Sequence, residues 1–445
     1  MIPNDICFVY DKMSNDLQKY YNLKNVDPDV VNHKQYGVST GRFRNAGHHF
    51  KDKISKGRNV STSTFKQARQ NGSFIVYEIG TVESPNVWLE DLLGSSKRKS
   101  KKNIFDLIYD NNPKLYQHVR NKTAIIHIDQ GLEAFPLHSV RTSHWTIDNA
   151  CYYKVIHEKL EYYKINASSI HYSTANLHEQ AVYDQWCIDN NILDKIVIHS
   201  YNSFALAVSH CGYLNQHTEE SAGVTIEEHL EYKSKHDIKT FSNLNRVIRT
   251  HRVEFLKMLN YYDLIKGSET SFAKTTLSSL VTYPAHPAWS ADNENATMQL
   301  LPLTLDVTDF NINQAQNFFK ETYLNTWYSV VTETFFQDYF KYSIFFSEKI
   351  FKPMRARHPF ILVGQPYGLR ELKNLGFKTF DSFWDESYDE CRNPTERLEK
   401  ICMLIKHLNR YTKSEWLSIY REMESILEHN YNHLRFTDWS EGINV

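Results

Sequence analysis

The sequence predicts an α/β protein made of two α/β domains, with a helical segment at its C-terminal end. Three observations predict this class. Short apolar runs of strand length alternate with amphipathic stretches of helix length in both halves of the chain, which is typical of parallel sheets with helical crossovers. A polar, acidic stretch at 211–238 separates the halves, and the region 393–433 shows the 3.6-residue pattern of helices throughout.

The first half begins with an apolar run, ICFVYDK, at residues 6–12. We expect helices between the apolar runs that follow. In one of these connections, LHEQAVYDQWCIDNN, the side chains of Val182, Trp186 and Ile188 suit one buried helix face. The first half therefore predicts one parallel sheet. Its further strands are expected at 73–80, 123–129, 168–174 and 195–201.

The second half begins with the predicted strand 239–245, followed by a helix over 249–265 with Gly267 after its end. Further strands are expected at 327–334 and 358–364. Between them, Ser347 is the predicted N-cap of a helix whose first residue is Glu348. The expected domains are an acceptor-side domain at 1–235, a second α/β domain at 236–392 and the helical segment at 393–445.

Composition excludes several classes of protein. The 445 residues are 41% hydrophobic and 23% charged, so the chain can bury cores and is neither disordered nor fibrous. Six scattered cysteines without a CxxC pair disfavour a disulfide scaffold or a zinc knuckle. No apolar run approaches the 18 or so residues that cross a bilayer, and the N-terminus lacks the pattern of a signal peptide. We therefore expect a cytoplasmic protein.

The charge is uneven along a chain that carries 51 basic and 52 acidic residues. Between Asn32 and Lys102 there are 14 basic and 5 acidic residues, an excess of 9 positive charges. Such a segment can bind a polyanion such as nucleic acid, or it can be a solvated loop. Its densest charges, the candidate acceptor-binding residues, are Lys97, Arg98, Lys99, Lys101 and Lys102.

Several enzyme signatures are missing. The sequence has no GxGxxG after its first strand, no GxxxxGK[ST], no GxSxG and no HExxH, which disfavours dinucleotide oxidoreductases, P-loop ATPases, α/β-hydrolases and zincins. The only DxD is Asp27-Pro28-Asp29, in an early polar stretch instead of directly after a central strand. We therefore expect no catalytic metal and no cofactor.

The strongest motif is FFSEKIFKPMRARHPFILVG, residues 345–364. A helix N-terminus presents free backbone N–H groups and the positive end of the helix dipole, which suits a phosphate. Lys349 and Lys352 add positive charge there, and the carboxylate of Glu348 can accept hydrogen bonds from both hydroxyls of a ribose. The competing interpretation is structural: Glu348 complements the helix dipole and the lysines are solvated.

This segment resembles the donor-binding segment of fucosyltransferase-type GT-B glycosyltransferases, including bacterial and phage enzymes, over residues 239–392. The resemblance implies two Rossmann-like domains facing a cleft, with a nucleotide-sugar site in the second. It places Glu348 on the ribose and Lys349 near the diphosphate. The loop at Thr332, Glu333 and Thr334 matches a loop that contacts base or ribose. This sequence has Glu333-Thr334-Phe335 where fucosyltransferases more often have Glu-Asn-Ser, so the resemblance does not fix GDP-fucose as the donor.

A second motif, LNRVIRTHR at 244–252, resembles a stretch of the same phage-type enzymes. Arg246, Arg249 and Arg252 are spaced by three, so on a first helical turn they would share one side. There they could hold a diphosphate through bidentate hydrogen bonds. The alternative is a solvated basic face, and Asn245 or His251 could add hydrogen bonds.

A catalytic base is harder to identify. HIDQGLEAF, residues 127–135, supplies Asp129 and Glu133 just beyond the end of a strand, where sites of α/β proteins usually lie. Asp11 after the first strand is a rival, and each of these carboxylates taken alone is more often structural.

Together these observations predict a metal-independent glycosyltransferase that moves a hexosyl or pentosyl group from a nucleotide-sugar to an acceptor hydroxyl. The acceptor is a hydroxymethylated DNA base or a glycan, and the basic segment makes a role in DNA modification a real candidate. The alternative from another class is a non-catalytic module of the same fold that binds a glycan or a nucleic acid.

Overall fold

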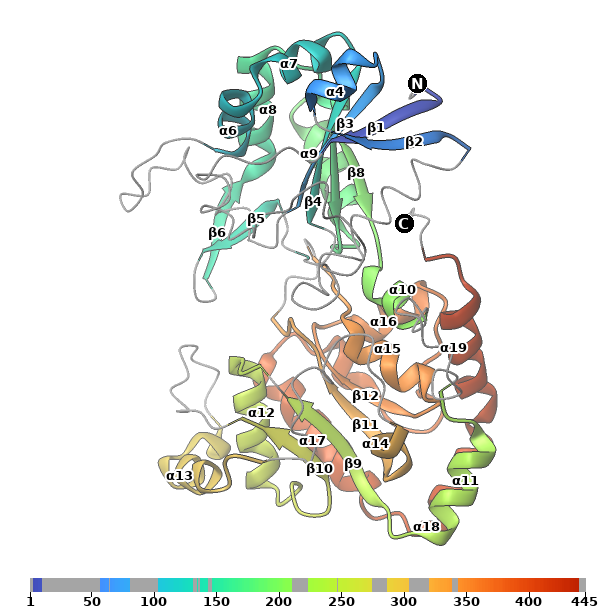
Figure 1. Ribbon diagram of the computed structural model, residues 1–445. Coiled ribbons are helices and arrows are strands. Elements are labelled where there is room, and N and C mark those ends of the chain that lie inside the picture. The colour runs from blue at the N-terminus through green and yellow to red at the C-terminus, as the bar shows by residue number, and fades with distance from the viewer. Residues whose placement is uncertain are drawn as a thin grey trace. The chain divides into compact units, whose positions relative to one another are not determined.

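The structure is a computed structural model, in which the chain divides into two compact units (Figure 1). Unit 1 comprises Met1–Ser203, Lys341–Phe345 and Trp439–Val445, and unit 2 comprises Phe204–Phe340 and Phe346–Asp438. Each unit is described by itself below. The residues that the structure describes are 3–9, 57–63, 65–80, 103–130, 134, 137–142, 146–209, 223–245, 247–273, 286–303, 320–337 and 343–439.

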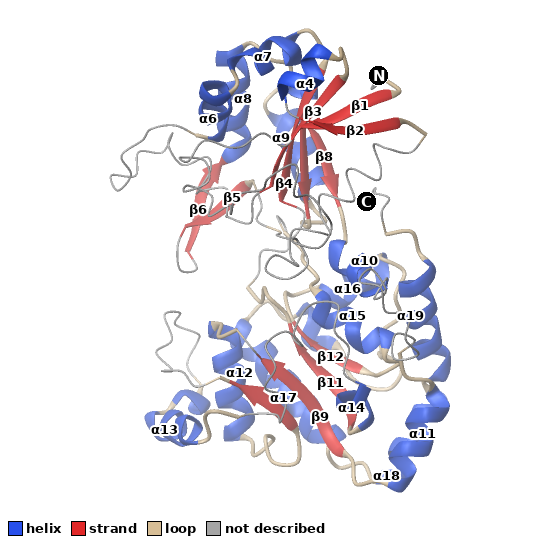
Figure 2. Ribbon diagram, viewed as in Figure 1, coloured by secondary structure: helices blue, strands red, loops and turns tan. Residues whose placement is uncertain are grey.

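Unit 1 contains a six-stranded, all-parallel sheet of order β2-β1-β3-β4-β7-β8 (Figure 2). The five predicted strands of the first half are confirmed, and β2 is an addition whose polar sequence, NVSTS, gives no apolar run. The strands are β1 (Asp5–Val9), β2 (Asn59–Ser63), β3 (Phe74–Gly80), β4 (Ala124–Gln130), β7 (Ile170–Thr174) and β8 (Val197–Ser200).

Helices pack on one face of this sheet and bury its largest apolar cluster. The predicted helix between β7 and β8 exists as α9, and two of the three side chains expected on its buried face, Val182 and Trp186, pack partly buried against the core. Tyr183 and Cys187 are fully buried, whereas Ile188 is 66% exposed. The helices are α4 (Phe65–Gln70), α6 (Ile104–Asn111), α7 (Pro113–Arg120), α8 (Tyr152–Tyr163) and α9 (Glu179–Asp189), and a hairpin of β5 (His138–Thr142) and β6 (Thr146–Cys151) precedes α8.

A short segment from late in the chain completes unit 1. The Ser343 hydroxyl donates to the Ala134 carbonyl at 2.7 Å, and the backbone of Ile344 pairs with the Asn176 side chain and with Leu177 N. The chain then passes into unit 2 at Phe346. Of the predicted nucleotide-binding motif at 345–364, the first residue, Phe345, belongs to unit 1 and the rest belongs to unit 2.

Unit 2 contains a four-stranded, all-parallel sheet of order β10-β9-β11-β12. The predicted strands at 239–245, 327–334 and 358–364 are confirmed as β9, β11 and β12. The short strand β10 pairs beside β9, so the chain places its second strand on one side of the first and its third on the other. The strands are β9 (Lys239–Asn245), β10 (Glu269–Phe272), β11 (Thr326–Thr332) and β12 (Phe360–Val363).

Helices surround this second sheet. The described part of the predicted C-terminal helical segment contains the last three of the helices named below. Part of the polar stretch 211–238, which was expected to separate the two halves, forms helix α11, and this helix opens with a capping box of Thr225 and Glu228. The helices are α10 (Ser203–Ser209), α11 (Ile226–Lys235), α12 (Thr250–Tyr261), α13 (Ala291–Gln299), α14 (Lys320–Leu324), α15 (Glu348–Arg355), α16 (Gly368–Asn374), α17 (Pro394–Leu408), α18 (Lys413–Glu422) and α19 (Glu424–Phe436).

The core of unit 2 includes a buried cluster of basic side chains. Lys233 Nζ donates to the carbonyls of Tyr323 at 2.8 Å and of Thr326, and His229 and His358 lie close to it. Burial lowers the pKa of both histidines well below the ordinary value, so both are neutral. Lys233, His229 and His358 all hydrogen-bond to backbone carbonyls, so these buried carbonyls have partners without water.

Candidate functional site

The candidate site lies at the carboxyl edge of the unit 2 sheet. Strand β9 has β10 on one side and β11 on the other. The strand order therefore changes direction between β9 and β11, which makes this position a topological switch point. Open α/β sheets bind ligands outside the carboxyl ends of their strands at such a switch point. The strands that flank this position end at Asn245 and Thr332, and the predicted site residues follow them.

Hydrogen bonds between side chains tie the two flanking strands together. The Thr332 hydroxyl donates to Asn245 Oδ1 at 2.5 Å, and Asn245 Nδ2 donates to Asn243 Oδ1 at 2.6 Å. Asn243 in turn donates to the Val330 carbonyl at 2.7 Å. Thr332 and Asn245, both predicted to contact a ligand, are therefore partners of each other and hold this edge together.

Arg252 supports the loop that follows β11. It is 2% exposed, and its guanidinium donates to the carbonyls of Val247 at 2.9 Å, Thr332 at 3.0 Å and Glu333 at 3.2 Å. Burial, with the nearby charge of Arg249, lowers the pKa of Arg252 to about 10. His251, also buried, hydrogen-bonds to the Glu333 carbonyl at 2.9 Å.

The predicted shared helical side of the three arginines is not observed, because α12 begins only at Thr250. Arg249 is the N-cap residue, with extended backbone angles of −138° and 148°. Arg252 is in the first turn, and Arg246 lies outside the described residues. Arg249 is half-buried, and its charge helps to lower the pKa of Arg252.

Glu333 connects the end of β11 to the start of α15. Its carboxylate accepts from Ser347 N at 3.1 Å, from Ser347 Oγ at 2.5 Å and from Thr334 N at 3.1 Å. Burial raises the pKa of Glu333, although Lys349 and Ser347 oppose the shift. Both carboxylate oxygens thus have protein partners, and Glu333 positions the helix N-terminus.

Ser347 and Glu348 occupy the predicted positions. Ser347 is the N-cap of α15, and Glu348 is its first residue. Lys349 Nζ lies 3.0 Å from both Ser347 Oγ and Glu348 Oε1. Burial would raise the pKa of Glu348, but Lys349 and Lys352 outweigh it and lower the pKa to about 2. Glu348, with 22% of its side chain exposed, is therefore ionised at every ordinary pH.

The charges at this edge favour an anion. Four cations, Arg249, Arg252, Lys349 and Lys352, stand against two carboxylates, and the pKa shifts of Arg252, Glu333 and Glu348 show that these groups influence one another. A helix N-terminus adds its dipole. The arrangement combines one ionised carboxylate, able to accept hydrogen bonds from a diol, with excess positive charge suited to a phosphate.

The other predicted residues lie in unit 1 or outside the described residues. Asp129, 7% exposed, is on the carboxyl half of β4, on the same face as His127. His127 Nε2 lies 2.7 Å from Ser173 Oγ, and burial lowers its pKa, helped by two nearby histidines. Outside the described residues lie Glu133, Asp11 and the five basic residues Lys97, Arg98, Lys99, Lys101 and Lys102.

Sequence reasoning missed Glu179, a fully buried carboxyl in unit 1. It accepts from Tyr153 Oη at 2.5 Å, Asn176 Nδ2 at 2.7 Å and Leu137 N at 3.1 Å. Burial raises the pKa of Glu179 to about 7. The signal in the sequence was Asn176, which follows a predicted strand and lies three residues before Glu179. The hydrogen bonds of Glu179 to Tyr153, Asn176 and Leu137 show that its role is structural.

Comparison of the chain with family models, with curated proteins and with solved structures finds no match. The two parallel sheets are consistent with two Rossmann-like domains. Within the described ranges, no helix has the length and apolar character needed to cross a bilayer. The same residues hold no group of three or more side chains placed to ligate a metal ion.

Proposed function

We propose that the chain is a glycosyltransferase that binds a nucleotide-sugar at the carboxyl edge of the unit 2 sheet. The observation that supports this most directly is Glu348, an ionised carboxylate on the first turn of a helix, flanked by Lys349 and Lys352. In the proposal Glu348 accepts hydrogen bonds from the ribose hydroxyls. Lys349 and Lys352 face the diphosphate, and Arg249 adds charge from the opposite loop.

The reaction transfers a glycosyl group. The acceptor oxygen forms a bond to the anomeric carbon, the bond between that carbon and the diphosphate oxygen breaks, and the nucleoside diphosphate leaves with the bonding electrons. The acceptor proton passes to a carboxylate, for which Asp129 and Glu133 are the candidates. Cations and helix N–H groups stabilise the negative charge that develops on the leaving group.

A panel of UDP-, GDP-, CMP- and dTDP-sugars tests the proposal. Binding is measured by thermal shift, and turnover by release of free nucleoside diphosphate, or of CMP from the CMP-sugars. Binding with turnover supports a transferase, and binding without turnover supports a non-catalytic module of the same fold. If no member of the panel binds, the proposal of a nucleotide-sugar site is contradicted.

Transfer should not depend on a divalent metal, because in the proposal Lys349, Lys352 and Arg249 neutralise the charge of the diphosphate. We expect turnover to be unchanged after EDTA treatment and dialysis. Complete loss of activity, restored by Mn²⁺ or Mg²⁺, would contradict the proposed role of Lys349 and Lys352.

A further inference from the structure

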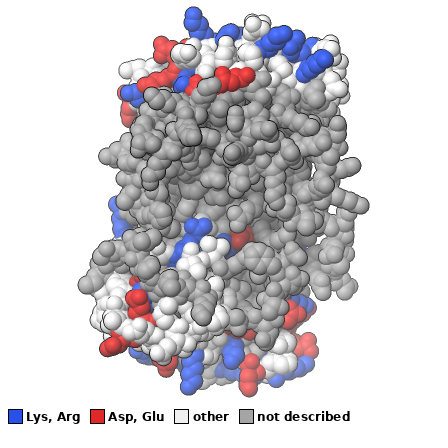
Figure 3. All heavy atoms as spheres, turned by 60° about the vertical axis from the view of Figure 1, so that its left-hand side comes forward, with Lys and Arg blue, Asp and Glu red and all other residues white. Residues whose placement is uncertain are grey.

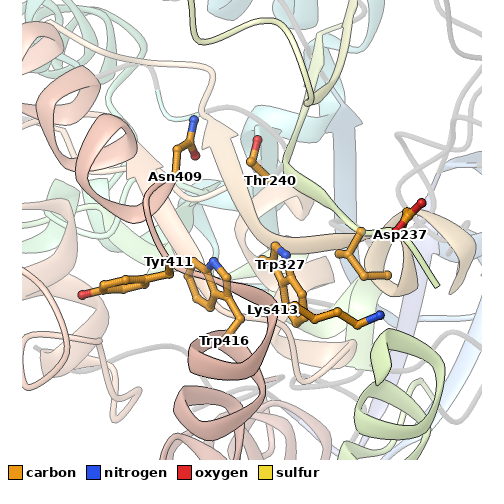
Figure 4. A pocket seen from close by; sticks show the side chains of 8 residues that line it. Asp237, Thr240, Trp327, Asn409, Tyr411, Lys413 and Trp416 are labelled. Carbon is orange, nitrogen blue, oxygen red and sulfur yellow. The ribbon is translucent and has the colours of Figure 1, made fainter. Parts of the chain in front are cut away.

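A cavity of about 260 Å³ lies in unit 2 at the opposite end of the sheet from the candidate site. Thr240 is the second residue of β9 and Trp327 is the second residue of β11, so the cavity opens at the amino ends of these strands. The loop before α18 and its first turn supply the other side (Figure 4). The lining residues are Asp237, Ile238, Thr240, Trp327, Asn409, Tyr411, Lys413 and Trp416.

Aromatic rings form the floor of this cavity. Trp327 and Trp416 stack with their ring centroids 5.7 Å apart and their planes 6° apart, and Tyr411 meets Trp416 edge to face at 5.6 Å. The two indoles are 5% and 2% exposed, whereas Tyr411 is half-buried. Because the indole faces contact each other, a flat base cannot insert between them. The surface left to a ligand is the tyrosine ring and the edges of the indoles.

Polar groups of both hydrogen-bonding kinds surround the rings. The Asp237 carboxylate is an acceptor on an exposed residue, and the Lys413 ammonium, also exposed, uses one of its protons on the His236 carbonyl at 2.9 Å. Asn409 accepts from Tyr328 Oη at 3.1 Å through Oδ1, which leaves its amide N–H groups as donors. The Thr240 hydroxyl donates to the Gly267 carbonyl at 3.2 Å, so its oxygen is available as an acceptor. One carboxylate and one ammonium make the lining neutral overall.

We propose that this cavity is a saccharide-binding site, separate from the nucleotide-sugar site and independent of the proposed transferase activity. A sugar ring has C–H groups that pack against aromatic rings and hydroxyls that both donate and accept hydrogen bonds. A neutral lining with donors, acceptors and an aromatic floor matches that chemistry. The volume is near the lower limit of small-molecule sites, which suits a single sugar ring.

Saturation-transfer NMR tests the site with three probes: methyl β-glucoside, methyl β-galactoside and N-acetylglucosamine. Tyr411→Ala removes the half-buried tyrosine ring, and Asp237→Asn removes the charged acceptor. Tyr162→Ala, which removes a 73% exposed tyrosine in unit 1, is the matched control. Glu348→Ala separates this site from the donor site, and thermal unfolding shows that each variant is folded.

We expect at least one probe to bind the wild-type protein at millimolar concentration. Tyr411→Ala and Asp237→Asn should each weaken this binding about tenfold, while Tyr162→Ala and Glu348→Ala leave it unchanged. Binding of none of the probes, or binding by both cavity variants that is as tight as that of the wild type, would overturn the inference. So would loss of the signal in Glu348→Ala, or displacement of the sugar by uridine or adenosine.

Discussion

Glu348 has a structural and a functional explanation, and the two differ in a measurable way. A carboxylate at the first position of a helix stabilises that helix through the dipole, whatever else it does. Unit 2 contains a second glutamate at the same position, Glu424 of α19, which is exposed. Comparing the two residues isolates any contribution of Glu348 to a ligand.

Glu348→Ala should weaken nucleotide binding about 10- to 100-fold, because a charge-assisted hydrogen bond contributes about 1.5–3 kcal/mol. Glu424→Ala should leave the dissociation constant unchanged. The measurement is titration calorimetry with the nucleoside diphosphate selected by the panel, alongside thermal unfolding. Equal dissociation constants for both variants would show that Glu348 does not contact the nucleotide and only stabilises the helix through its dipole.

His229 gives a second prediction at the residue scale. Burial holds its pKa well below 6.5, so in the folded protein it stays neutral where the unfolded chain takes up a proton. Unfolding then binds one more proton below pH 6.5, and this residue makes stability fall as the pH falls through that range. Replacing it removes that contribution.

His229→Gln, which keeps a donor for the Ala356 carbonyl, should therefore make the acid-side slope of the unfolding free energy shallower by about 1.4 kcal/mol per pH unit. Urea unfolding at several pH values between 4.5 and 7.5 measures the slope. His407→Gln, at an exposed position, controls for the substitution itself. A slope identical to that of the wild type would mean that His229 is protonated in the folded protein.

The sequence was informative about residues whose role is local and uninformative about those whose partners are distant. Ser347 as N-cap and Glu348 as first helical residue could be predicted because capping depends on neighbours within four positions. The bonds of Glu333 to Ser347 and of Arg252 to Thr332 join residues 14 and 80 positions apart. A motif spacing cannot reveal them, so residues predicted to contact a ligand proved to have protein partners.

At the scale of elements, α15 depends on two supports at its start. Ser347 Oγ accepts from Lys349 N at 3.4 Å and donates to Glu333 at 2.5 Å. The helix N-terminus that is proposed to face the diphosphate is thereby fixed to the loop after β11. In the same unit, Ser290 caps α13 by accepting from Asn293 N at 3.3 Å, without a comparable bond to a carboxylate.

Ser347→Ala and Ser290→Ala should each lower the free energy of unfolding, by about 1 kcal/mol for the lost cap. Ser347→Ala should cost more, because it also leaves the buried Glu333 with one partner fewer. Only Ser347→Ala should weaken nucleotide binding. Denaturant unfolding and calorimetry measure both quantities. If Ser290→Ala weakened binding equally, the effect would be one of general stability.

Strands with apolar runs were predictable, whereas β2 and β10 were not. NVSTS and ETSF contain few apolar residues, so neither segment shows the apolar run by which the other strands were predicted. The buried face of helix α9 was predicted in part: Val182 and Trp186 pack against the core, whereas Ile188 is exposed.

At the scale of the whole molecule, charge is the property that the sequence reports best. On the face drawn in Figure 3, Lys and Arg side chains are interspersed with Asp and Glu side chains on the described part of each unit. The strongest basic excess in the sequence, between Asn32 and Lys102, falls mostly outside the described residues. Its role as an acceptor-binding segment stays a prediction.

If this segment binds DNA phosphates, binding of hydroxymethylated duplex DNA should weaken steeply with salt. About four to six contacts give a log–log slope near −4 to −5. Replacing Lys97, Arg98, Lys99, Lys101 and Lys102 by glutamine should flatten the slope and leave donor binding unchanged. The measurement is fluorescence anisotropy between 50 and roughly 300 mM salt.

The control variant changes the net charge by the same amount at exposed positions elsewhere, and its slope should stay near that of the wild type. A flat titration for the wild type, or the same slope for wild type and five-fold variant, would contradict the DNA acceptor and favour a glycan. The exposed control lysines are Lys114, Lys154, Lys266, Lys378 and Lys400.

The chain passes between the two units after Ser203, Phe340, Phe345 and Asp438. On the ribosome, domains made of one continuous stretch fold in the order in which they emerge. Here unit 1 still lacks Ser343 and Ile344, with their bonds to Ala134 and Asn176, when its first 203 residues have been translated. All six strands of the first sheet lie within those residues, so the sheet can form early. The chain at Ala134 and Asn176 gains these partners only after three of the four strands of the second sheet have been synthesised, so unit 1 is finished late in translation.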